Sequence, residues 1–256
     1  MELGKAMKNH RYISDLFSKK RDMDGFIKGI SQAFQSMDGL NGTFAGDNLI
    51  TLDKNLSFLT DEPFMKAFNA HATTRVERGI IWRMMTVLWG ARNGLRLQGD
   101  FMECACYKGI TARIVCDTID FGAYPDRHYY LYDLFEHDTS MPHHHMPEHS
   151  QTLFDEVKGR FAHLPNVTVT QGRVPDSFSQ ALPDKIAFLH LDLNNAEAEI
   201  GALDILFERM VPGAVMVLDD YGWLGYRAQK LAEDDWLGKR GYHVLELPTG
   251  QGLLIK

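Results

Sequence analysis

The sequence predicts an α/β protein with a mostly parallel sheet, and three observations beyond residue 99 support this. Short apolar runs alternate with helix-length stretches about four times, a rhythm typical of parallel strands joined by helices that cover both faces of a sheet. Polar or acidic residues follow several of the apolar runs directly. The last two apolar runs flank a turn at 248–251, which predicts a hairpin and therefore one antiparallel strand.

The first part of the chain has a different character. Residues 1–95 are rich in Met, Phe and Lys, with apolar positions at helical spacing over 64–68 and 80–88. Thr60 or Asp61 is a suitable N-cap for a helix that has Pro63 in its first turn. The glycine-rich stretch 39–46 predicts a loop. We therefore expect residues 1–95 to form a helical cap or lid and residues 96–256 to form one α/β domain.

The elements of the α/β domain follow from the apolar runs and the helical periodicity between them. The expected strands are 101–104, 129–132, 167–170, 186–191, 214–218, 242–247 and 252–255. The expected helices are 111–121, 151–162, 196–210 and 226–240.

Composition restricts the class of protein. The 256 residues are 45% hydrophobic and 24% charged, which is ordinary for a globular chain and excludes a disordered or coiled-coil protein. A net charge of −7 disfavours nucleic acid as the main partner. No apolar run reaches the roughly 18 residues that a membrane span needs. The three cysteines, all between 104 and 116, form no disulfide framework and indicate a reducing compartment, so we expect a cytoplasmic protein.

The segment after the first expected strand suits a nucleotide-like cofactor. The strand ends at the acidic Glu103, a turn follows with Gly109, and a helix opens at Thr111, so the helix N-terminus would face a polar group. A single glycine does not clear the backbone for a pyrophosphate, which counts against NAD and ATP. An ordinary turn between a strand and a helix is the alternative.

Asp133 ends the second expected strand, about 30 residues after the first turn. An acid at this position of a nucleotide-binding sheet can accept hydrogen bonds from a ribose diol. The alternative is that Asp133 caps the segment that follows.

Three aspartates follow the fourth and fifth expected strands: Asp192 after one, and Asp219 and Asp220 after the other. If these strands are neighbours, the three carboxylates converge at one edge of the sheet, and their repulsion requires a compensating cation or protons. A hard divalent ion such as Mg²⁺ prefers such oxygen ligands. The alternative is that Asp219 and Asp220 only begin a loop.

A run of three histidines, His143, His144 and His145, lies between two prolines and matches no zinc motif. It is either a polar loop or a substrate-facing loop with one working histidine, because histidine titrates near neutrality. We expect Cys104 and Cys106 to be small packing residues.

With these residues identified, the chain resembles the class I S-adenosylmethionine-dependent methyltransferases. More narrowly, it resembles the macrocin O-methyltransferase family, which methylates sugar hydroxyls of macrolides and related natural products. The resemblance covers about residues 75–256 and is carried by three stretches: GDFMECACYKG at 99–109, LYDLFE at 131–136, and Asp192 through DDYG at 219–222. It implies a Rossmann-like, seven-stranded methyltransferase sheet in which the C-terminal hairpin supplies the antiparallel strand.

The resemblance also implies a set of site residues. Asp192, Asp219 and Asp220 would hold Mg²⁺ or a similar divalent cation. The cofactor, S-adenosylmethionine, would be lined by Glu103, Tyr107, Gly109, Thr111 and Asp133, and we add Gly172 after the third strand. The chain departs from the family where Ala105 and Ile110 replace glycines of the turn, and where Asn194 and Ala196 replace an Asp and a Tyr.

The expected reaction is metal-dependent methyl transfer to a hydroxyl of a small molecule, such as a sugar of a natural product or glycan. Asp192, or a histidine from 143–145, is the candidate general base. A catechol-type O-methyltransferase and a non-catalytic S-adenosylmethionine-binding module are the alternatives, and a nicotinamide dehydrogenase is a weaker one, since the glycine fingerprint is missing. We expect a homo-oligomer on general grounds, with neither nucleic acid nor membrane as partner.

Overall fold

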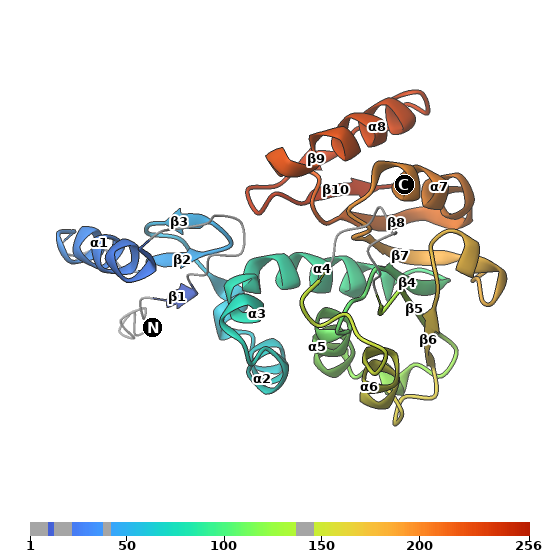
Figure 1. Cartoon of the computed structure of the whole chain (residues 1–256), viewed down its shortest axis with the longest axis horizontal. Coiled ribbons are helices and arrows are strands. Elements are labelled where there is room, and N and C mark those ends of the chain that lie inside the picture. Colours follow the sequence, from blue (N-terminus) through green and yellow to red (C-terminus); the bar gives the residue numbers. More distant parts are fainter. Residues whose placement is uncertain (1–9, 13–21, 38–41, 137–145) are drawn as a thin grey trace. The chain divides into compact units, whose positions relative to one another are not determined.

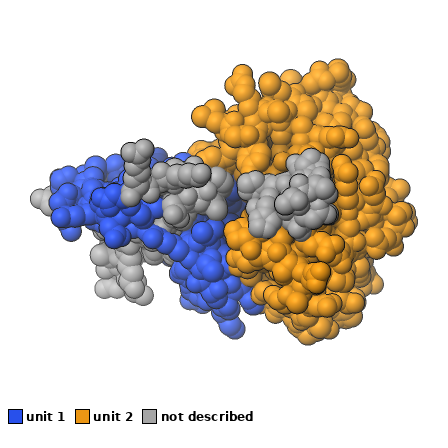
Figure 2. All heavy atoms as spheres, viewed as in Figure 1, with its two compact units in different colours: residues 1–85 blue, residues 86–256 orange. Residues whose placement is uncertain are grey.

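The computed structural model describes residues 10–12, 22–37, 42–136 and 146–256 (Figure 1). The chain divides into two compact units, Met1–Met85 and Thr86–Lys256 (Figure 2). The division falls within helix α4 (Ile81–Gly94), whereas the expected boundary near residue 95 coincides with the end of that helix.

The first unit contains helices and a small sheet. Asp61 is the N-cap of α2, where it accepts a hydrogen bond from the Phe64 amide at 3.2 Å, and Pro63 lies in the first turn as predicted. Phe64 and Phe68 are fully buried on the inner side of this helix. The helices of the unit are α1 (Met23–Gln35), α2 (Glu62–His71) and α3 (Arg75–Gly79), and its strands are β1 (His10–Tyr12), β2 (Phe44–Gly46) and β3 (Leu49–Thr51).

The loop predicted for 39–46 is wrong for residues 44–46, which form β2 and pair antiparallel with β3. Two residues, Asp47 and Asn48, join the strands with φ of +50° and +55°. A two-residue turn with positive φ at both positions matches the twist of a hairpin, and Asp and Asn tolerate it. This Asp-Asn pair was the overlooked sequence signal.

The second unit is built on a seven-stranded sheet in the order β6-β5-β4-β7-β8-β10-β9. The first five strands in this order are parallel, and β10 runs antiparallel to both of its neighbours. Helices α5 and α6 lie on one face and α7 and α8 on the other (Figure 1). The bounds are β4 Asp100–Cys104, α5 Ile110–Ile119, β5 Tyr129–Asp133, α6 Leu153–Arg160, β6 Val167–Gln171, β7 Ile186–Leu191, α7 Ala196–Leu206, β8 Met210–Leu218, α8 Arg227–Gly238, β9 Leu245–Glu246 and β10 Gly252–Ile255.

The predicted fold class, a mostly parallel methyltransferase-type sheet with an antiparallel C-terminal strand, is confirmed. The largest local differences from the predicted elements lie at the ends of individual strands and helices. Strand β8 begins at Met210 rather than 214, with an irregularity in its pairing with β7 where Gly213 takes a φ of +85°. The helix expected to reach residue 210 ends at Leu206 and continues only as a 3₁₀ turn, Phe207–Arg209. The strand expected at 242–247 is confined to Leu245–Glu246.

The two faces of the sheet carry different cores. Alternate strand residues such as Met102, Leu189 and Met216 are buried in the apolar cluster to which α7 contributes Ala202, Leu203 and Leu206. The intervening residues include Phe101 and Phe188, whose ring centroids lie 5.5 Å apart. This alternation, with a period of two residues, decides on which face each later polar residue of a strand lies.

Two further expectations concern the environment of the chain. All three cysteines are buried and none forms a disulfide; Cys104 and Cys106 pack in the interior as predicted. Among the described helices, none combines the length and apolar character needed to cross a membrane.

Candidate active site

The carboxyl ends of the central strands enclose the candidate site. Strand β4 lies between β5 and β7, so the order of the strands reverses there, and ligands of open α/β sheets bind at such a point. A pocket is found at these strand ends. Its lining includes Tyr107, Asp133, His149, Gly172 and Asp192.

The turn after β4 has an unusual backbone. Ala105, Tyr107 and Gly109 have φ of +69°, +49° and +66°, in the left-handed region. Only Gly109 is suited to it, and a Cβ there would lie 2.9 Å from the Phe161 ring. Hydrogen bonds from the turn to the end of β5 hold the two strained residues: the Ala105 amide donates to the Tyr132 carbonyl at 2.8 Å, and the Tyr107 amide to Asp133 at 2.7 Å.

Asp133 organises this end of the pocket. It is buried, and its carboxylate accepts backbone N–H groups from Tyr107 and Phe135, both at 2.7 Å. Burial raises the pKa of Asp133 to about 6; the charge of Glu103 adds to this, while the backbone donors oppose it. Each carboxylate oxygen has a second lone pair, so Asp133 can also accept a hydrogen bond from a ligand hydroxyl.

His149, which the sequence analysis did not single out, lies beside Asp133. Its Nε2 is 3.8 Å from Asp133 Oδ1, and its ring stands edge-on to Tyr107 with centroids 5.7 Å apart. The hydroxyl of Tyr107 donates to Glu148, which fixes the neighbouring segment against the turn. The predicted histidines His143, His144 and His145 lie outside the described residues.

The predicted cofactor residues divide into two groups. Tyr107, Asp133 and Gly172 line the pocket, whereas Glu103, Gly109 and Thr111 are not among its lining residues. Gly172 has a φ of +150°, and a Cβ there would lie 2.9 Å from Ser177 Cβ, so this wall requires glycine. Glu103 is buried, and its Oε2 accepts a hydrogen bond from Tyr129 Oη at 2.9 Å.

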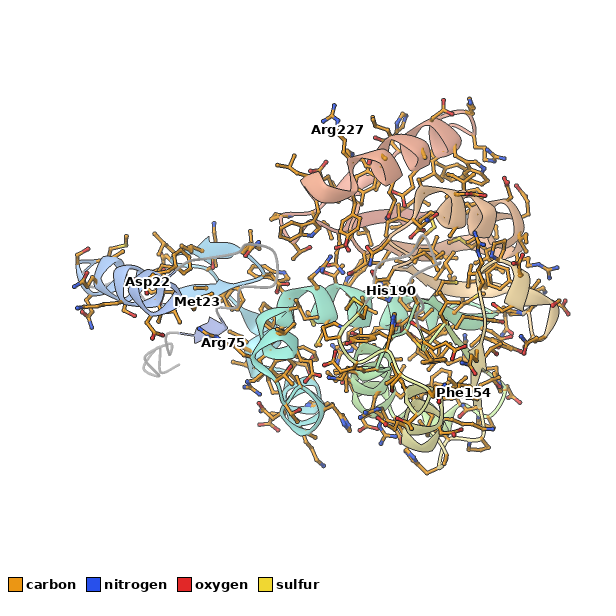
Figure 3. All side chains as sticks on the ribbon, viewed as in Figure 1. Asp22, Met23, Arg75, Phe154, His190 and Arg227 are labelled. Carbon is orange, nitrogen blue, oxygen red and sulfur yellow. The ribbon has the colours of Figure 1, made fainter. Side chains whose placement is uncertain are left out.

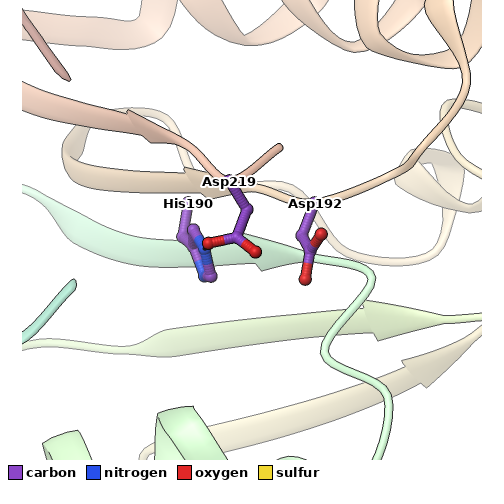
Figure 4. Close-up of side chains that lie close together, drawn as sticks. All are labelled: His190, Asp192 and Asp219. Carbon is purple, nitrogen blue, oxygen red and sulfur yellow. The ribbon is translucent and has the colours of Figure 1, made fainter. Parts of the chain in front are cut away.

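Two of the three predicted aspartates meet as expected, because β7 and β8 are neighbours. The Asp192 amide donates to the Cys104 carbonyl at 3.0 Å, and the Asp219 amide to the Leu191 carbonyl at 2.8 Å. His190 joins them: one ligand atom from each of His190, Asp192 and Asp219 lies within 4.8 Å of the others (Figure 4). The sequence signal for His190 was its position two residues before Asp192, on the same face of the strand.

Asp220 is not part of this group. It continues the face of Met216 and Leu218, which packs toward α7, whereas Asp219 continues the opposite face. Burial is the main cause that raises the pKa of Glu199 and of Glu233, and the charge of Asp220 adds to it. The expectation that all three carboxylates converge is therefore met by Asp192 and Asp219, with His190 in the third place.

His190 lies in the interior of the second unit (Figure 3), with 3% of its surface exposed. Its Nδ1 is 3.4 Å from Glu103 Oε1, and its Nε2 is 3.5 Å from Asp219 Oδ1. Burial alone lowers the pKa of His190, but Asp219 and Glu103 outweigh it and raise the pKa well above its usual value. Gln251 Nε2 also donates to Asp219 Oδ1 at 2.8 Å.

A second group of buried acids lies on the opposite face. Glu199 of α7 and Glu233 of α8 are both fully buried. Glu199 Oε1 accepts the Leu193 amide at 2.9 Å, which ties α7 to the residue after Asp192. Burial raises the pKa of both carboxyls, that of Glu233 to about 7.

Comparison with known proteins agrees with the fold. Residues 102–221 match the profile of a family described as a methyltransferase domain, Methyltransf_24. No curated protein matches the sequence. The matched region lies within the second unit, and its similarity to a methyltransferase domain agrees with the class that the sequence predicted.

Solved structures share this fold at low sequence identity. The O-methyltransferase NovP is 16% identical, with a TM-score of 0.62, over 78% of this chain and 99% of its own. CalS11, described as a calicheamicin methyltransferase and as a TDP-rhamnose 3′-O-methyltransferase, is 16% identical with a TM-score of 0.55, over 79% of this chain and 93% of its own. PaMTH1 of Podospora anserina, bound to S-adenosylhomocysteine, is 11% identical with a TM-score of 0.50, over 94% of this chain and 99% of its own.

Proposed function

We propose that the chain transfers a methyl group from S-adenosylmethionine to a hydroxyl of a small molecule, such as a sugar of a natural product or glycan, with a divalent cation. One observation carries the proposal: Asp192 of the cation group and Asp133 of the cofactor side line the same pocket. A methyl donor and a cation-bound acceptor need this proximity. The similarity to NovP and to the sugar-modifying CalS11 supports the choice of acceptor.

The cofactor side has the features that S-adenosylmethionine requires. Asp133 can accept from the ribose diol, and His149 beside it offers a ring nitrogen to the same sugar. Gly172 keeps the wall of the pocket free of a side chain. S-adenosylmethionine supplies an electrophilic methyl group on sulfur, so the protein needs to supply orientation and a better nucleophile.

The cation side fits a divalent ion. Asp192 and Asp219 offer carboxylate oxygens, and both ring nitrogens of His190 lack a well-formed hydrogen bond to a described residue. A bound divalent cation lowers the pKa of an oxygen that it contacts. Asp220 as a third ligand and Mg²⁺ as the ion stay predictions from the sequence.

The chain's own residues then have separate tasks. The β7 and β8 ends fix the backbone of Asp192 and Asp219 through hydrogen bonds, and a cation held by these two carboxylates would orient the acceptor hydroxyl relative to the methyl donor. Asp192, which lines the pocket, is positioned to take the proton of the acceptor hydroxyl. A histidine from 143–145 remains the alternative base.

The test is a methyl-transfer assay that follows S-adenosylhomocysteine with matched sugar and catechol acceptors. We expect turnover with sugar hydroxyls, loss of turnover in EDTA, and recovery when a divalent ion is added. Turnover with catechols alone would identify the catechol-type alternative. Binding of S-adenosylmethionine without turnover on any acceptor would favour the non-catalytic binding module. A cap formed by residues 1–95, a cytoplasmic location and a homo-oligomer remain predictions.

A further inference from the structure

We propose that His190 is a nitrogen ligand of the cation site, so that the site binds a first-row transition ion such as Mn²⁺, Co²⁺ or Zn²⁺ in preference to Mg²⁺. The inference rests on the proposed function, because it concerns the cation that assists methyl transfer. It names a ligand and a class of metal that the sequence did not predict.

The first argument is the geometry of the three side chains. One ligand atom from each of His190, Asp192 and Asp219 lies within 4.8 Å of the others. Ligand atoms bound at about 2.1 Å to one ion lie roughly 3 to 4 Å apart, so small side-chain adjustments are enough to bring all three to an ion. In Figure 4, one oxygen of Asp219 lies beside the His190 ring and the other lies on the side of Asp192.

The second argument is an unsatisfied ring. His190 is 3% exposed, and neither of its ring nitrogens makes a well-formed hydrogen bond to a described residue. Buried polar atoms are almost always satisfied by a partner, and each exception requires an explanation. An ion between Nε2 and the two carboxylates would satisfy one ring nitrogen.

The third argument is the shell around these residues. Metal-bound histidine usually donates its other N–H to a carboxylate, which fixes the ring. Here Nδ1 faces Glu103 Oε1 at 3.4 Å, and Tyr129 holds the other Glu103 oxygen at 2.9 Å. On the far side, Gln251 donates to Asp219. This arrangement gives Glu103, predicted to line the cofactor, the different task of orienting a ligand.

The donor set decides the class of metal. Mg²⁺ prefers an octahedron of oxygen ligands and is reluctant to lose its water. Imidazole suits the later first-row ions, which bind a mixed nitrogen and oxygen site more tightly. One imidazole and two carboxylates therefore favour Mn²⁺, Co²⁺ or Zn²⁺.

The experiment measures metal binding directly, without turnover. The full chain is prepared without an affinity tag and with His143, His144 and His145 each replaced by Asn, because that histidine run could bind metal by itself. Affinities for Mg²⁺, Mn²⁺ and Co²⁺ are measured by calorimetry. Pulsed electron paramagnetic resonance of the Cu²⁺-loaded protein detects the remote nitrogen of a bound imidazole, and ¹⁵N-histidine labelling of the same protein identifies that signal without any change at residue 190.

Two variants complete the design. His190→Gln removes the proposed ligand. His128→Gln is the matched control, because His128 is half-buried next to the opposite end of β5 and contacts Thr168. We expect Co²⁺ to bind at least about tenfold more tightly than Mg²⁺, and the imidazole signal to be lost in His190→Gln but kept in His128→Gln.

The outcomes separate the two proposals. A bound metal with no histidine nitrogen signal overturns this inference and leaves the proposed function standing. Absence of binding by every ion tested overturns both the inference and the metal dependence; His190 then serves as a positive charge between Glu103 and Asp219. A nitrogen signal, combined with no methyl transfer on any acceptor by the chain that keeps His143, His144 and His145, would support the inference and contradict the proposed function.

Discussion

The two faces of the sheet beside β7 and β8 bury acids in contrasting ways. On one face, Glu103 and Asp219 are separated by the His190 ring, with Gln251 as a further donor. On the other face, the charge of Glu233 acts on Glu199, and the charge of Asp220 acts on both glutamates. Burial raises the pKa of both glutamates. The first face places a histidine ring between its two carboxylates, whereas on the second face Glu199 accepts from the Leu193 amide and Glu233 accepts from Gln229.

This contrast shows how one strand end can serve two purposes. Buried carboxylates that repel one another need a positive charge or a proton. Of the group formed by His190, Asp192 and Asp219, Asp192 lines the pocket, and a cation would reach the group beside this residue. The opposite face contributes to the structure, through the hydrogen bond that the Leu193 amide donates to Glu199.

The largest effect is expected when the neighbouring residues Asp219 and Asp220 are each replaced by Asn in separate variants. Asp219→Asn should lower kcat/KM for methyl transfer by about 1,000-fold, or roughly 4 kcal/mol, because it removes a charge at the cation. Asp220→Asn should lower kcat/KM by less than about tenfold, since Asp220 lies on the face of Glu199 and Glu233 rather than with His190. Equal losses in the two variants would place Asp220 among the ligands and erase the distinction between the faces.

The second prediction concerns pH and stability. The pKa of Glu233 is raised from 4.5 to about 7 in the folded chain, so the folded state binds more protons than the unfolded state between these values. Its contribution to stability is therefore complete below about pH 4.5 and is lost as the pH rises through about 7. Glu233→Gln should be more stable than the parent at pH 8 by on the order of 3 kcal/mol, and nearly equal to it at pH 4.5.

Urea unfolding at both pH values measures this difference. Glu199→Gln serves as a companion variant, because it removes the other half of the charge-coupled pair. A Glu233→Gln protein whose advantage does not change with pH would show that the carboxyl is not held neutral by burial.

A third prediction concerns the effect of Glu199, on the face opposite His190, on cation binding. Glu199→Leu should weaken cation binding about tenfold, because the Leu193 amide next to Asp192 loses its buried acceptor. Glu199→Gln keeps an acceptor oxygen and should bind the cation as the parent does. Glu233→Leu is the matched control, since Glu233 is equally buried and accepts a hydrogen bond from the side chain of Gln229 rather than from a backbone amide next to Asp192. Calorimetry with the apo proteins distinguishes the three; equal weakening in both leucine variants would indicate a general loss of packing.

The smallest effect is expected where backbone geometry rather than charge matters. Ala105 has a left-handed conformation that costs an ordinary residue about 1 kcal/mol. Ala105→Gly removes this cost but raises the conformational entropy of the unfolded chain. The free energy of unfolding should therefore rise by about 0.5 kcal/mol. Thermal unfolding measures it. Destabilisation by more than about 1 kcal/mol would show that packing of the Ala105 methyl group outweighs the strain.

Much of the candidate site could be predicted from the sequence. Strand ends at Asp133, Asp192 and Asp219 follow from local apolar runs, and β-sheet topology brings them to one edge. His149 and His190 were missed because each acts through a neighbour that is distant in sequence: Asp133 for the first, and Glu103 and Asp219 for the second. The Ala105 and Tyr107 backbone was missed because side-chain identity there does not suggest positive φ.

The sequence by itself determined the class of fold, the order of the strands along the chain and the acids that end them, because these depend on local periodicity and turn chemistry. Only the tertiary structure decided which acids share a face. Side chains alternate along a strand, so Asp219 and Asp220, adjacent in sequence, belong to different groups, while His190 and Glu103 meet across neighbouring strands. The physical reason is that burial and charge compensation depend on neighbours across the sheet rather than along the chain.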